Sequence, residues 1–460
     1  MSFLGVDVGT TGAKALLVDA HGNVKASATH EYPMLHPRPL WAEQDPKEWW
    51  EAAQRSIAQV ADGHVEAVGL TGQMHGLVLL DAKGEVLRPC IMWNDQRTEA
   101  QCADISAKTD VLSLTGNRVL PGFTAPKIVW VREHEPDVYA RIAKVLLPKD
   151  YVRYRLTGEF FTDVSDASGT SLFDVQRRAW SDEMLDALEI PRAWLPEVTE
   201  SAEVSAKVRG GPLDGTSVVG GAGDQAAQAV GAGAVQEGIV SVTLGTSGVV
   251  FAASDSYRMD PRLHSFCHAV RDKWHLMGVM LSAAGSLRWY RDLMGGEQYD
   301  ELLAAAPPSS DGVIFLPYLS GERTPHPDPH AKGVFFGLTL RHTKAHLTRA
   351  VLEGVAFGLR DSLELMRAQG LSFEQVRVSG GGAKSALWRQ ILADVFNTEI
   401  VTVGVTEGAA YGAALLGMAE RPEPTLLDPI LPGPDAEGYA ETYRRYRALY
   451  PALAERFRDE

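Results

Sequence analysis

The feature of this sequence that most constrains its fold is a motif that occurs twice. An apolar run at residues 3–8 leads into the turn Gly9-Thr10-Thr11-Gly12 and a second apolar run. The same order returns at residues 239–252, with Gly245-Thr246-Ser247-Gly248 as the turn. Two short apolar runs joined by a Gly/Thr turn predict a β-hairpin. Because the second copy begins near the middle of the 460 residues, we predict two related α/β domains, at residues 1–236 and 237–460.

Each hairpin turn is a candidate phosphate site, because backbone N–H groups and hydroxyls in such a turn can bind phosphate oxygens. Asp7 lies just before the first turn and could hold Mg²⁺ through water, whereas Thr243 occupies the same place in the second copy. One acid and two phosphate-binding turns suit one nucleotide with one metal ion. For either copy alone, an ordinary hairpin with a polar tip is the alternative.

Asp224 is a candidate active-site carboxylate. Val218 and Val219 favour a strand end, the glycines after them allow a tight turn, and Ala226 can start a helix. Asp224 is therefore expected at a strand-to-helix turn, where its carboxylate can point into a cleft. A helix cap is the alternative, because Asp is a favoured N-cap residue.

Polar side chains that could contact a small ligand lie between the two hairpins. Gln73, Met74 and His75 follow a strand expected at residues 65–70, and Trp93 ends another short apolar run. Together they could bind the hydroxyls and the apolar face of a small polar ligand. A lone His at such a place is more often structural than functional.

Two loops rich in Pro and Gly carry charged residues. Lys127 opens a helix expected at residues 127–133 and is a candidate ligand contact, although most lysines are simply solvated. Glu322 and Arg323 are neighbours in the second loop. We expect them to form a buried ion pair that holds the domain interface.

A glycine-rich turn follows a strand expected at residues 376–379 and precedes a helix expected at 384–396. Gly380, Gly381 and Gly382 would let a flat ring or a phosphate lie against the backbone, and a helix N-terminus favours negative charge. The turn is not a Walker loop, because Ala383 stands where that pattern needs Gly. Further helices are expected at residues 343–365, 407–419 and 440–457.

The composition argues against several classes of function. The formal net charge is −15, whereas nucleic-acid binding depends on clustered Lys and Arg, so we expect no nucleic-acid partner. Three cysteines without a C-x-x-C pair fit a reducing compartment. Without a basic leader or a run of about 18 apolar residues, we expect a soluble, cytoplasmic protein with no membrane partner. His264, Cys267 and His268 lack the fourth ligand and the spacing of a zinc site.

Two other classes of protein share parts of this pattern. Residues 221–226 fit the G-x-G-x-x-A fingerprint of dehydrogenases, but residues 241–244 read S-V-T-L where that fingerprint expects an acid. A dehydrogenase would also leave the repeat unexplained. A non-catalytic, nucleotide-gated binding protein of the actin or chaperone type remains open. Such a protein would not need the polar set at residues 73–75, 93–95 and 224.

Several motifs resemble those of a known family. D-V-G-T-T-G at 7–12, T-L-G-T-S-G at 243–248 and S-G-G-G-A-K-S at 379–385 are similar to the two phosphate loops and the adenosine loop of the actin-like ATPase superfamily. Residues 122–134 and 333–353 resemble the two signatures of the FGGY carbohydrate kinases. The resemblance spans nearly the whole chain. It implies an α/β fold of two ribonuclease H-like domains with an interdomain cleft, and a kinase that uses ATP and Mg²⁺.

The resemblance also implies roles for individual residues. Asp224 is the implied catalytic base, and Asp7 is the implied Mg²⁺ residue. Sugar contacts are implied for Gln73, Met74, His75, Trp93, Asp224 and Gln225. ATP contacts are implied for Thr10, Thr11, Lys14 and Thr246 at the phosphates, and for Gly380, Gly381, Gly382 and Ser385 at the adenosine. An Asp with its ordinary pKa would be ionised at neutral pH, as such a base requires.

The implied substrate is a ketopentose. Blocks such as L-W-A-E-Q-D-P-K-E-W-W from Leu40 and L-P-Y-L-S-G-E-R-T-P-H from Leu316 are most similar to family members that phosphorylate D-xylulose. One departure is Gln225, where many of those proteins have Asn after the base. Because Gln is longer by one methylene, another ketopentose or a polyol stays open as the substrate. A homodimer is a further expectation.

Overall fold

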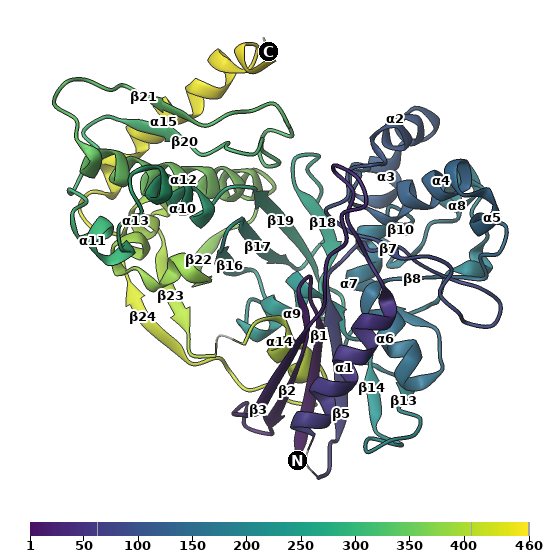
Figure 1. The fold of residues 1–460 in the computed structure, drawn as a ribbon. Coiled ribbons are helices and arrows are strands. Elements are labelled where there is room, and N and C mark those ends of the chain that lie inside the picture. The colour runs from purple at the N-terminus through teal and green to yellow at the C-terminus, as the bar shows by residue number, and fades with distance from the viewer. Residues whose placement is uncertain (62, 406, 459–460) are drawn as a thin grey trace.

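The computed structural model describes residues 1–61, 63–405 and 407–458. It contains two large sheets of seven strands, one in each half of the chain (Figure 1). The first has the order β13-β14-β5-β1-β2-β3, with β15 paired to β5. Its strands are β1 (Ser2–Val8), β2 (Gly12–Asp19), β3 (Val24–Glu31), β5 (Ala67–Gly72), β13 (Val204–Lys207), β14 (Ser217–Val219) and β15 (Ala222–Gly223).

The second sheet has the order β18-β19-β17-β16-β22-β23-β24. Its strands are β16 (Gly238–Leu244), β17 (Gly248–Ser254), β18 (His264–Cys267), β19 (Trp274–Met280), β22 (Phe373–Ser379), β23 (Glu399–Val403) and β24 (Leu426–Ile430). Short paired strands lie outside the two sheets: β4 (Glu43–Gln44), β6 (Val78–Leu80), β7 (Cys90–Ile91), β8 (Lys144–Leu146), β9 (Phe161–Asp163), β10 (Phe173–Asp174), β11 (Ala179–Trp180), β12 (Glu197–Thr199), β20 (Ile314–Leu316) and β21 (Val334–Phe336).

The two sheets share one local arrangement, which confirms the predicted repeat of hairpins. β1 pairs with β2 in antiparallel and with β5 in parallel orientation, so that Asp7 lies opposite Lys14 and Thr71. β16 pairs in the same two ways with β17 and β22, and Thr243 lies opposite Ser379 on β22. The predicted α/β fold of two ribonuclease H-like domains is therefore confirmed.

Helices cover the sheets because each has one apolar face. In the first half, Asp45 caps α1 by accepting a hydrogen bond from the Lys47 N–H, and Trp49 and Ile57 of α1 are buried against β2 and β3. The helices of this half are α1 (Pro46–Val60), α2 (Glu99–Lys108), α3 (Val111–Thr115), α4 (Thr124–His134), α5 (Pro136–Tyr139), α6 (Pro148–Thr157), α7 (Val164–Ala167), α8 (Asp182–Leu188) and α9 (Asp224–Gly231).

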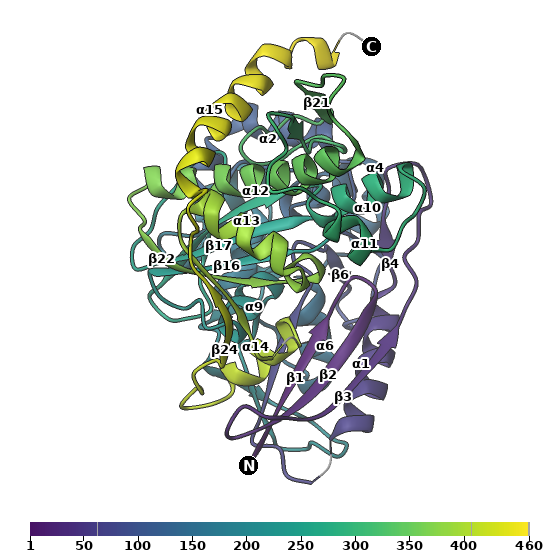
Figure 2. The same cartoon turned by 90° about the vertical axis from the view of Figure 1, so that its left-hand side faces the viewer.

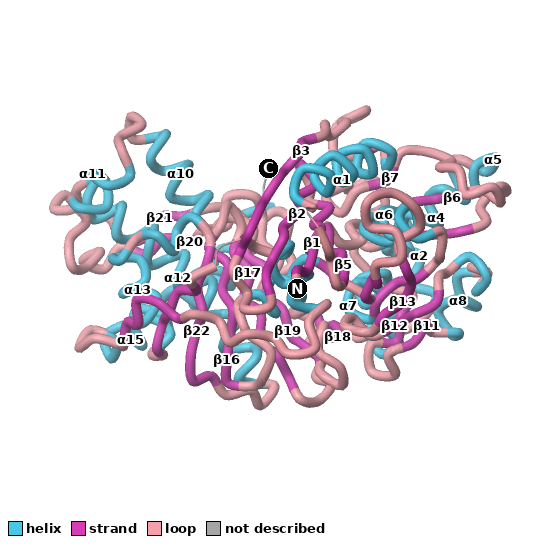
Figure 3. The backbone as a smooth tube through the Cα atoms, turned by 90° about the horizontal axis from the view of Figure 1, so that it is seen from below, coloured by secondary structure: helices cyan, strands magenta, loops and turns pink. Residues whose placement is uncertain are grey.

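In the second half, the long α12 begins at a capping box between Thr343 and His346 and packs on α10, α13, β19 and β20. The helices are α10 (Ala284–Leu293), α11 (Tyr299–Ala304), α12 (Lys344–Ala368), α13 (Ala386–Phe396), α14 (Ala409–Leu416) and α15 (Ala436–Leu453). Seen from below, α10–α13 lie on one side of β1, β2 and β5, and α2, α4, α5 and α8 lie on the other (Figure 3).

One helix of the second half packs on the sheet of the first. α14 contacts β1, β5 and α9, and Figures 1 and 2 show it beside β1. At the crossing of α9 and α14, a Cβ on Gly412 would lie 1.7 Å from the carbonyl oxygen of Ala227, so only glycine fits. The division at residue 236 remains a prediction, but the two halves clearly interlock at α9 and α14.

Two expectations need correction. The helix expected at residues 384–396 begins only at Ala386, because residues 381–384 form a 3₁₀ turn and Ser385 caps α13 by accepting a hydrogen bond from the Trp388 N–H. The predicted ion pair of Glu322 with Arg323 is wrong. The Glu322 carboxylate accepts hydrogen bonds from the backbone N–H groups of Leu281 and Arg323, at 3.0 and 2.7 Å, so the loop backbone takes the place of the guanidinium.

Within the three described ranges, no helix is long and apolar enough to span a membrane.

Candidate functional site

Asp224 is the first residue of α9, directly after β15. Its Oδ1 accepts a hydrogen bond from the Gln225 N–H at 2.7 Å, and the N-cap of α9 is Gly223, so the helix-cap interpretation of Asp224 is wrong. Burial raises the pKa of Asp224 to about 6. The expectation of an ordinary pKa is therefore wrong as well, although a carboxyl group with this pKa is still mostly ionised at pH 7.

Asp7 on β1 is the second carboxylate of the site. Burial and the negative charge of Asp224 raise the pKa of Asp7 to about 7, and the Lys14 ammonium opposes this rise. The Oδ1 atom of Asp7 is buried and has no hydrogen-bond partner among the described residues. A buried carboxylate oxygen without a donor is the environment that a cation would satisfy. Mg²⁺ needs only one or two protein carboxylates besides water and phosphate, so these residues fit that ion.

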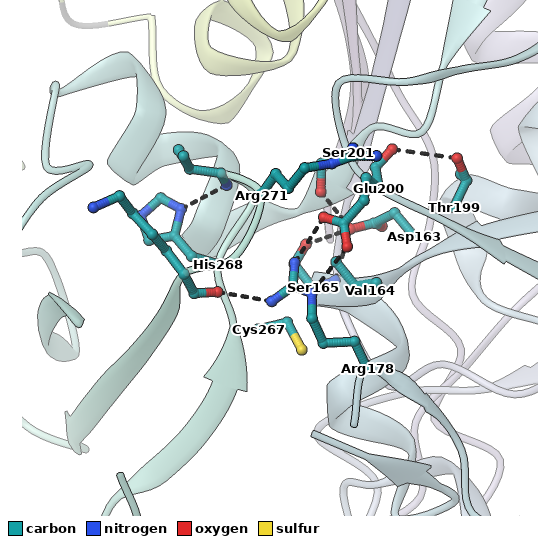
Figure 4. Close-up of polar contacts among 12 residues, drawn as sticks. Asp163, Val164, Ser165, Arg178, Thr199, Glu200, Ser201, Cys267, His268 and Arg271 are labelled. Atoms are coloured by element: carbon teal, nitrogen blue, oxygen red, sulfur yellow. Dashed lines mark hydrogen bonds and ion pairs between the residues drawn. The ribbon is translucent and has the colours of Figure 1, made fainter. Parts of the chain in front are cut away.

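Ser165 holds the backbone directly before Asp224. Its Oγ accepts a hydrogen bond from the Gly223 N–H at 3.1 Å and donates one to Asp163 at 2.6 Å. Ser201 also donates to Asp163, at 2.9 Å, and Figure 4 shows both serines around that carboxylate. The segment that presents Asp224 is thus fixed by buried polar groups rather than by loop packing alone.

A buried charge cluster supports this arrangement. The Lys149 ammonium on α6 lies 2.6, 2.9 and 3.1 Å from carboxylate oxygens of Asp150, Asp163 and Asp166. Arg153, one turn later on α6, donates hydrogen bonds to the carbonyl oxygens of Val219 and Gly220. Lys149, Arg153 and the three aspartates are all buried, so this charge cluster ties α6 to the turn that leads to Asp224.

Met74 and Gln73 lie beside this turn. A Cβ on Gly223 would be 2.9 Å from the Met74 sulfur, so Gly223 makes room for Met74 next to Asp224. Gln73 donates a hydrogen bond to the Gln44 side chain at 3.0 Å, and its own Oε1 is buried without a partner among the described residues. Gln73 therefore has an unused acceptor.

His75 adopts a left-handed backbone conformation, with φ of 68°, and its ring stacks on Phe123 at 4.5 Å. Nδ1–H donates a hydrogen bond to the Gly169 carbonyl oxygen at 2.7 Å, which leaves Nε2 as the acceptor of the neutral ring. Burial lowers the pKa of His75 well below its usual value, so the ring is neutral near pH 7. The loop that contains His75 thus presents an imidazole acceptor of fixed orientation.

Lys127 has a structural role, which corrects its interpretation as a ligand contact. Its fully buried ammonium donates hydrogen bonds to the carbonyl oxygens of His75 and Gly122, at 2.9 and 2.7 Å. Burial lowers the pKa of Lys127 to about 7. The side chain therefore holds the His75 turn against the loop before α4.

The first hairpin turn, a candidate phosphate site, lies next to a predicted sugar residue. The indole N–H of Trp93 donates a hydrogen bond to Thr10 Oγ1 at 3.2 Å. The Gln44 amide, which sequence reasoning missed, donates to the Thr10 carbonyl oxygen at 2.8 Å and so connects Thr10 with Gln73. Thr11, the next residue of the turn, is exposed. Thr10, Gln73 and Trp93 therefore belong to one connected site.

Lys14 forms an ion pair with Glu407, which precedes α14. Both side chains are partly buried, with 27% and 32% of their surfaces exposed. Lys14 also lies opposite Asp7 in the β1–β2 hairpin. The predicted phosphate lysine thus pairs with a carboxylate from the second half of the chain, and its charge also acts on Asp7 in the first half.

A cavity of about 540 Å³ opens beside the second hairpin turn, at Gly245 and Thr246. It brings together four predicted nucleotide residues, Thr246, Gly381, Gly382 and Ser385. Gly380 and the residues of the first turn are not part of its lining. Sequence reasoning missed the residues that α10 and α11 add to it, among them Arg288, Tyr299 and Asp300. No local motif marks these three, because only the packing of α10 and α11 brings them to the cavity.

Comparisons with known proteins agree with this geometry. Residues 2–231 match the N-terminal domain of the FGGY family of carbohydrate kinases, and residues 240–420 match its C-terminal domain. The xylulose kinase of Escherichia coli is 46% identical, over 98% of this chain and the whole of that protein.

Solved structures are similar over the same extent. A "xyloylose kinase" from Brucella ovis is 42% identical with a TM-score of 0.95, over 99% of this chain and all of that one. A xylulose kinase from Rhodospirillum rubrum is 31% identical with a TM-score of 0.94, also over 99% of this chain and all of its own. The match of both domains and the identity over nearly the full length show that this chain belongs to the FGGY family of carbohydrate kinases.

Proposed function

We propose that this chain transfers the γ-phosphoryl group of ATP to the primary hydroxyl of D-xylulose, giving D-xylulose 5-phosphate. The observation that supports this most is the pair of partly buried carboxylates Asp7 and Asp224, both with a raised pKa, beside Met74 and a neutral His75. The choice of D-xylulose as the sugar rests on the relatives, which are named xylulose kinases. The cavity beside Thr246 offers room for a nucleotide.

Asp224 is the proposed base of this reaction. Phosphoryl transfer passes through a loose transition state, so the protein contributes mainly alignment and charge neutralisation. Asp224 would align the hydroxyl in line with the γ-phosphate and accept its proton. A pKa of about 6 suits this task, because the carboxylate is ionised at pH 7 and still basic enough to take a proton.

The sugar would lie against the turn after β5. Gln73 Oε1 and His75 Nε2 are acceptors for sugar hydroxyls, Met74 offers an apolar surface, and Trp93 is a partly exposed aromatic face. Gln225, next to the base, would contact the sugar at the reacting end. Its extra methylene relative to Asn leaves another ketopentose or a polyol as the second candidate substrate.

The nucleotide would bind between the turns of the two hairpins. Thr10, Thr11, Lys14 and Thr246 are the proposed phosphate contacts, and Gly380, Gly381, Gly382 and Ser385 the proposed adenosine contacts. Asp7 is the proposed residue for Mg²⁺, with Asp224 nearby. Bound Mg²⁺ would offset the negative charge of the phosphates near these carboxylates.

An ADP-release assay tests the proposal. D-xylulose, L-xylulose, D-ribulose, L-ribulose, glycerol and gluconate are compared at saturating ATP, with and without Mg²⁺. We expect the highest kcat/KM with D-xylulose. A higher value for another sugar would change the substrate, and ATP binding without sugar-dependent ADP release would favour a nucleotide-gated binding protein instead.

A cytoplasmic location and the pairing of two copies belong to the same proposal. Light scattering on the purified chain tests the homodimer, and a mass equal to one chain would contradict it.

A further inference from the structure

The helix that begins with Asp224 has a polar contact to the other half of the molecule. The Gln228 amide on α9 donates hydrogen bonds to Thr243 Oγ1 at 2.6 Å and to Ser379 Oγ at 3.3 Å. The two hydroxyl oxygens lie 3.4 Å from each other. These three side chains are only partly exposed, and they form one cluster between α9 and the second sheet.

The cluster lies between the helix that carries Asp224 and the strand ends that precede the proposed nucleotide turns. Gln228 is four residues after Asp224 in the same helix, so both side chains lie on one face of α9. Thr243 is followed by the second phosphate turn, and Ser379 by the glycine turn at residues 380–382. The Gln228 amide therefore connects the helix of the carboxylate with the two strand ends that lead into the proposed nucleotide turns.

The two sheets have equivalent positions, so the residues of this cluster can be compared with their counterparts in the first half. Thr243 occupies in β16 the place of Asp7 in β1, and Ser379 occupies the place of Thr71. In the first half this place holds Asp7, whose Oδ1 has no partner among the described residues, whereas in the second half it holds Thr243, whose hydroxyl accepts a hydrogen bond from the Gln228 amide. The equivalent of the Asp7 position is thus an anchor for α9 rather than a second ion site.

We propose that Gln228 and Thr243 are positioning residues that fix the distance between Asp224 and the two nucleotide turns. In-line transfer depends on alignment, and a displacement of about 1 Å can lower a rate about a hundredfold. Figure 1 shows α9 between the two large sheets, so a shift of α9 relative to β16 would move the carboxylate relative to the nucleotide. This inference rests on the proposed kinase reaction.

The test compares matched variants of the full chain in the ADP-release assay with D-xylulose. Gln228→Met and Thr243→Val keep the approximate side-chain size but remove the hydrogen bond. We expect each to lower kcat about tenfold or more while the sugar KM changes less than about twofold. Thr243→Ser keeps the hydroxyl and should retain kcat within about twofold of the parent. A merely structural role would lower the melting temperature without this division between kcat and KM.

A double-mutant cycle completes the test. If the two residues act through their mutual hydrogen bond, the double variant loses no more kcat than the worse single variant. Additive losses, an unchanged kcat in both single variants, or a Thr243→Ser variant as slow as Thr243→Val would overturn the inference. An active parent with equally active variants refutes only the positioning role, whereas a parent without sugar-dependent ADP release refutes the proposed reaction as well. Should Thr243→Val fail to fold, the same comparison is made with Gln228→Met and Ser379→Ala.

Discussion

Lys14 on β2 pairs with Glu407, which lies 393 residues further along the chain, before the helix that packs on the first sheet. The same lysine faces Asp7 across the β1–β2 hairpin. A cation between two carboxylates is partly neutralised before any phosphate arrives. If Lys14 binds nucleotide phosphate as proposed, we expect Glu407 to compete with that phosphate for the Lys14 ammonium.

We expect Glu407→Gln to lower the KM for ATP, because the neutral amide releases the Lys14 charge. The pair is partly exposed, so the change should be about fivefold at most. Steady-state kinetics at saturating sugar measure it. Lys14→Gln is the matched control and should raise the same KM; a higher ATP KM in Glu407→Gln would show that Glu407 assists nucleotide binding instead.

Replacement of Asp224 by Asn should lower kcat by about a hundredfold or more, because it removes the proposed proton acceptor and keeps the shape. In the parent, kcat/KM for the sugar should fall as the pH drops below about 6, since the protonated carboxyl cannot accept a proton. The residual rate of Asp224→Asn should lack this dependence. Circular dichroism checks folding. Near-parental turnover of Asp224→Asn would show that the carboxylate is not part of the mechanism.

Gln225→Asn is the matched comparison for the neighbouring residue. It keeps the backbone N–H that donates a hydrogen bond to Asp224, so it should change the sugar KM more than kcat.

Asp7 should link the requirement for Mg²⁺ to pH. Its pKa of about 7 means that protons and Mg²⁺ compete for the carboxylate below that pH. We expect the Mg²⁺ concentration for half-maximal activity to rise up to about tenfold per pH unit below pH 7. Asp7→Asn should need more Mg²⁺ at every pH and lose the dependence. An unchanged Mg²⁺ requirement in this variant would place the ion elsewhere.

Ser165→Ala should lower both stability and turnover. It leaves the buried Gly223 N–H without its acceptor, which costs about 1–3 kcal/mol in the free energy of unfolding and frees the turn before Asp224. Urea unfolding and kcat measure the two effects. Ser201→Ala is the matched control, because Ser201 donates to the same Asp163 carboxylate but its side chain does not contact Gly223. For Ser201→Ala we expect a comparable loss of stability but a retained kcat. Equal kcat losses in both variants would show that turnover depends on the hydrogen bonds to Asp163 rather than on the one from Gly223.

His275 should make the fold sensitive to acid. Its ring is 2% exposed and stacks on Phe251, and burial lowers its pKa well below 6.5. Since the folded-state pKa lies below the unfolded one, protons bind preferentially to the unfolded chain, and stability is lost as the pH falls below about 6.5. His275→Phe should reduce the loss of unfolding free energy between pH 7 and pH 5 by about 2 kcal/mol. His264 and His268 lie near this ring, and burial lowers their pKa values as well, so part of the acid-induced loss of stability should remain in the variant. An identical loss in parent and variant would exclude His275 as a source.

The predictable parts of the molecule are those that depend on local sequence. The hairpins around Thr10 and Thr246 follow from apolar runs and Gly/Thr turns, and the place of Asp224 follows from valines, glycines and alanines in that order. The motif resemblance extended this to the family and to the two-domain fold. The helices expected at residues 343–365 and 384–396 agree with α12 and α13 to within a few residues.

Other features could not be read from local sequence because they depend on burial. Lys127 looked like a solvated or ligand-binding lysine, yet it is buried and holds two carbonyl oxygens. The sequence predicts an ordinary pKa for Asp224, whereas burial in the folded protein raises that pKa to about 6. Residue type alone predicts neither the hydrogen-bond partners of a side chain nor how deeply the side chain is buried.

The sequence by itself determined the repeat, the single acid before the first turn, the carboxylate at the strand-to-helix turn and the family. Only the tertiary structure decided how the two halves meet. Glu407 forms an ion pair with Lys14, Gln228 donates a hydrogen bond to Thr243, and α14 packs on the first sheet. The physical reason is the range of the interactions. Backbone conformation and turn chemistry act over a few neighbouring residues, whereas ion pairs, buried amides and charge burial join positions that only the folded chain brings together.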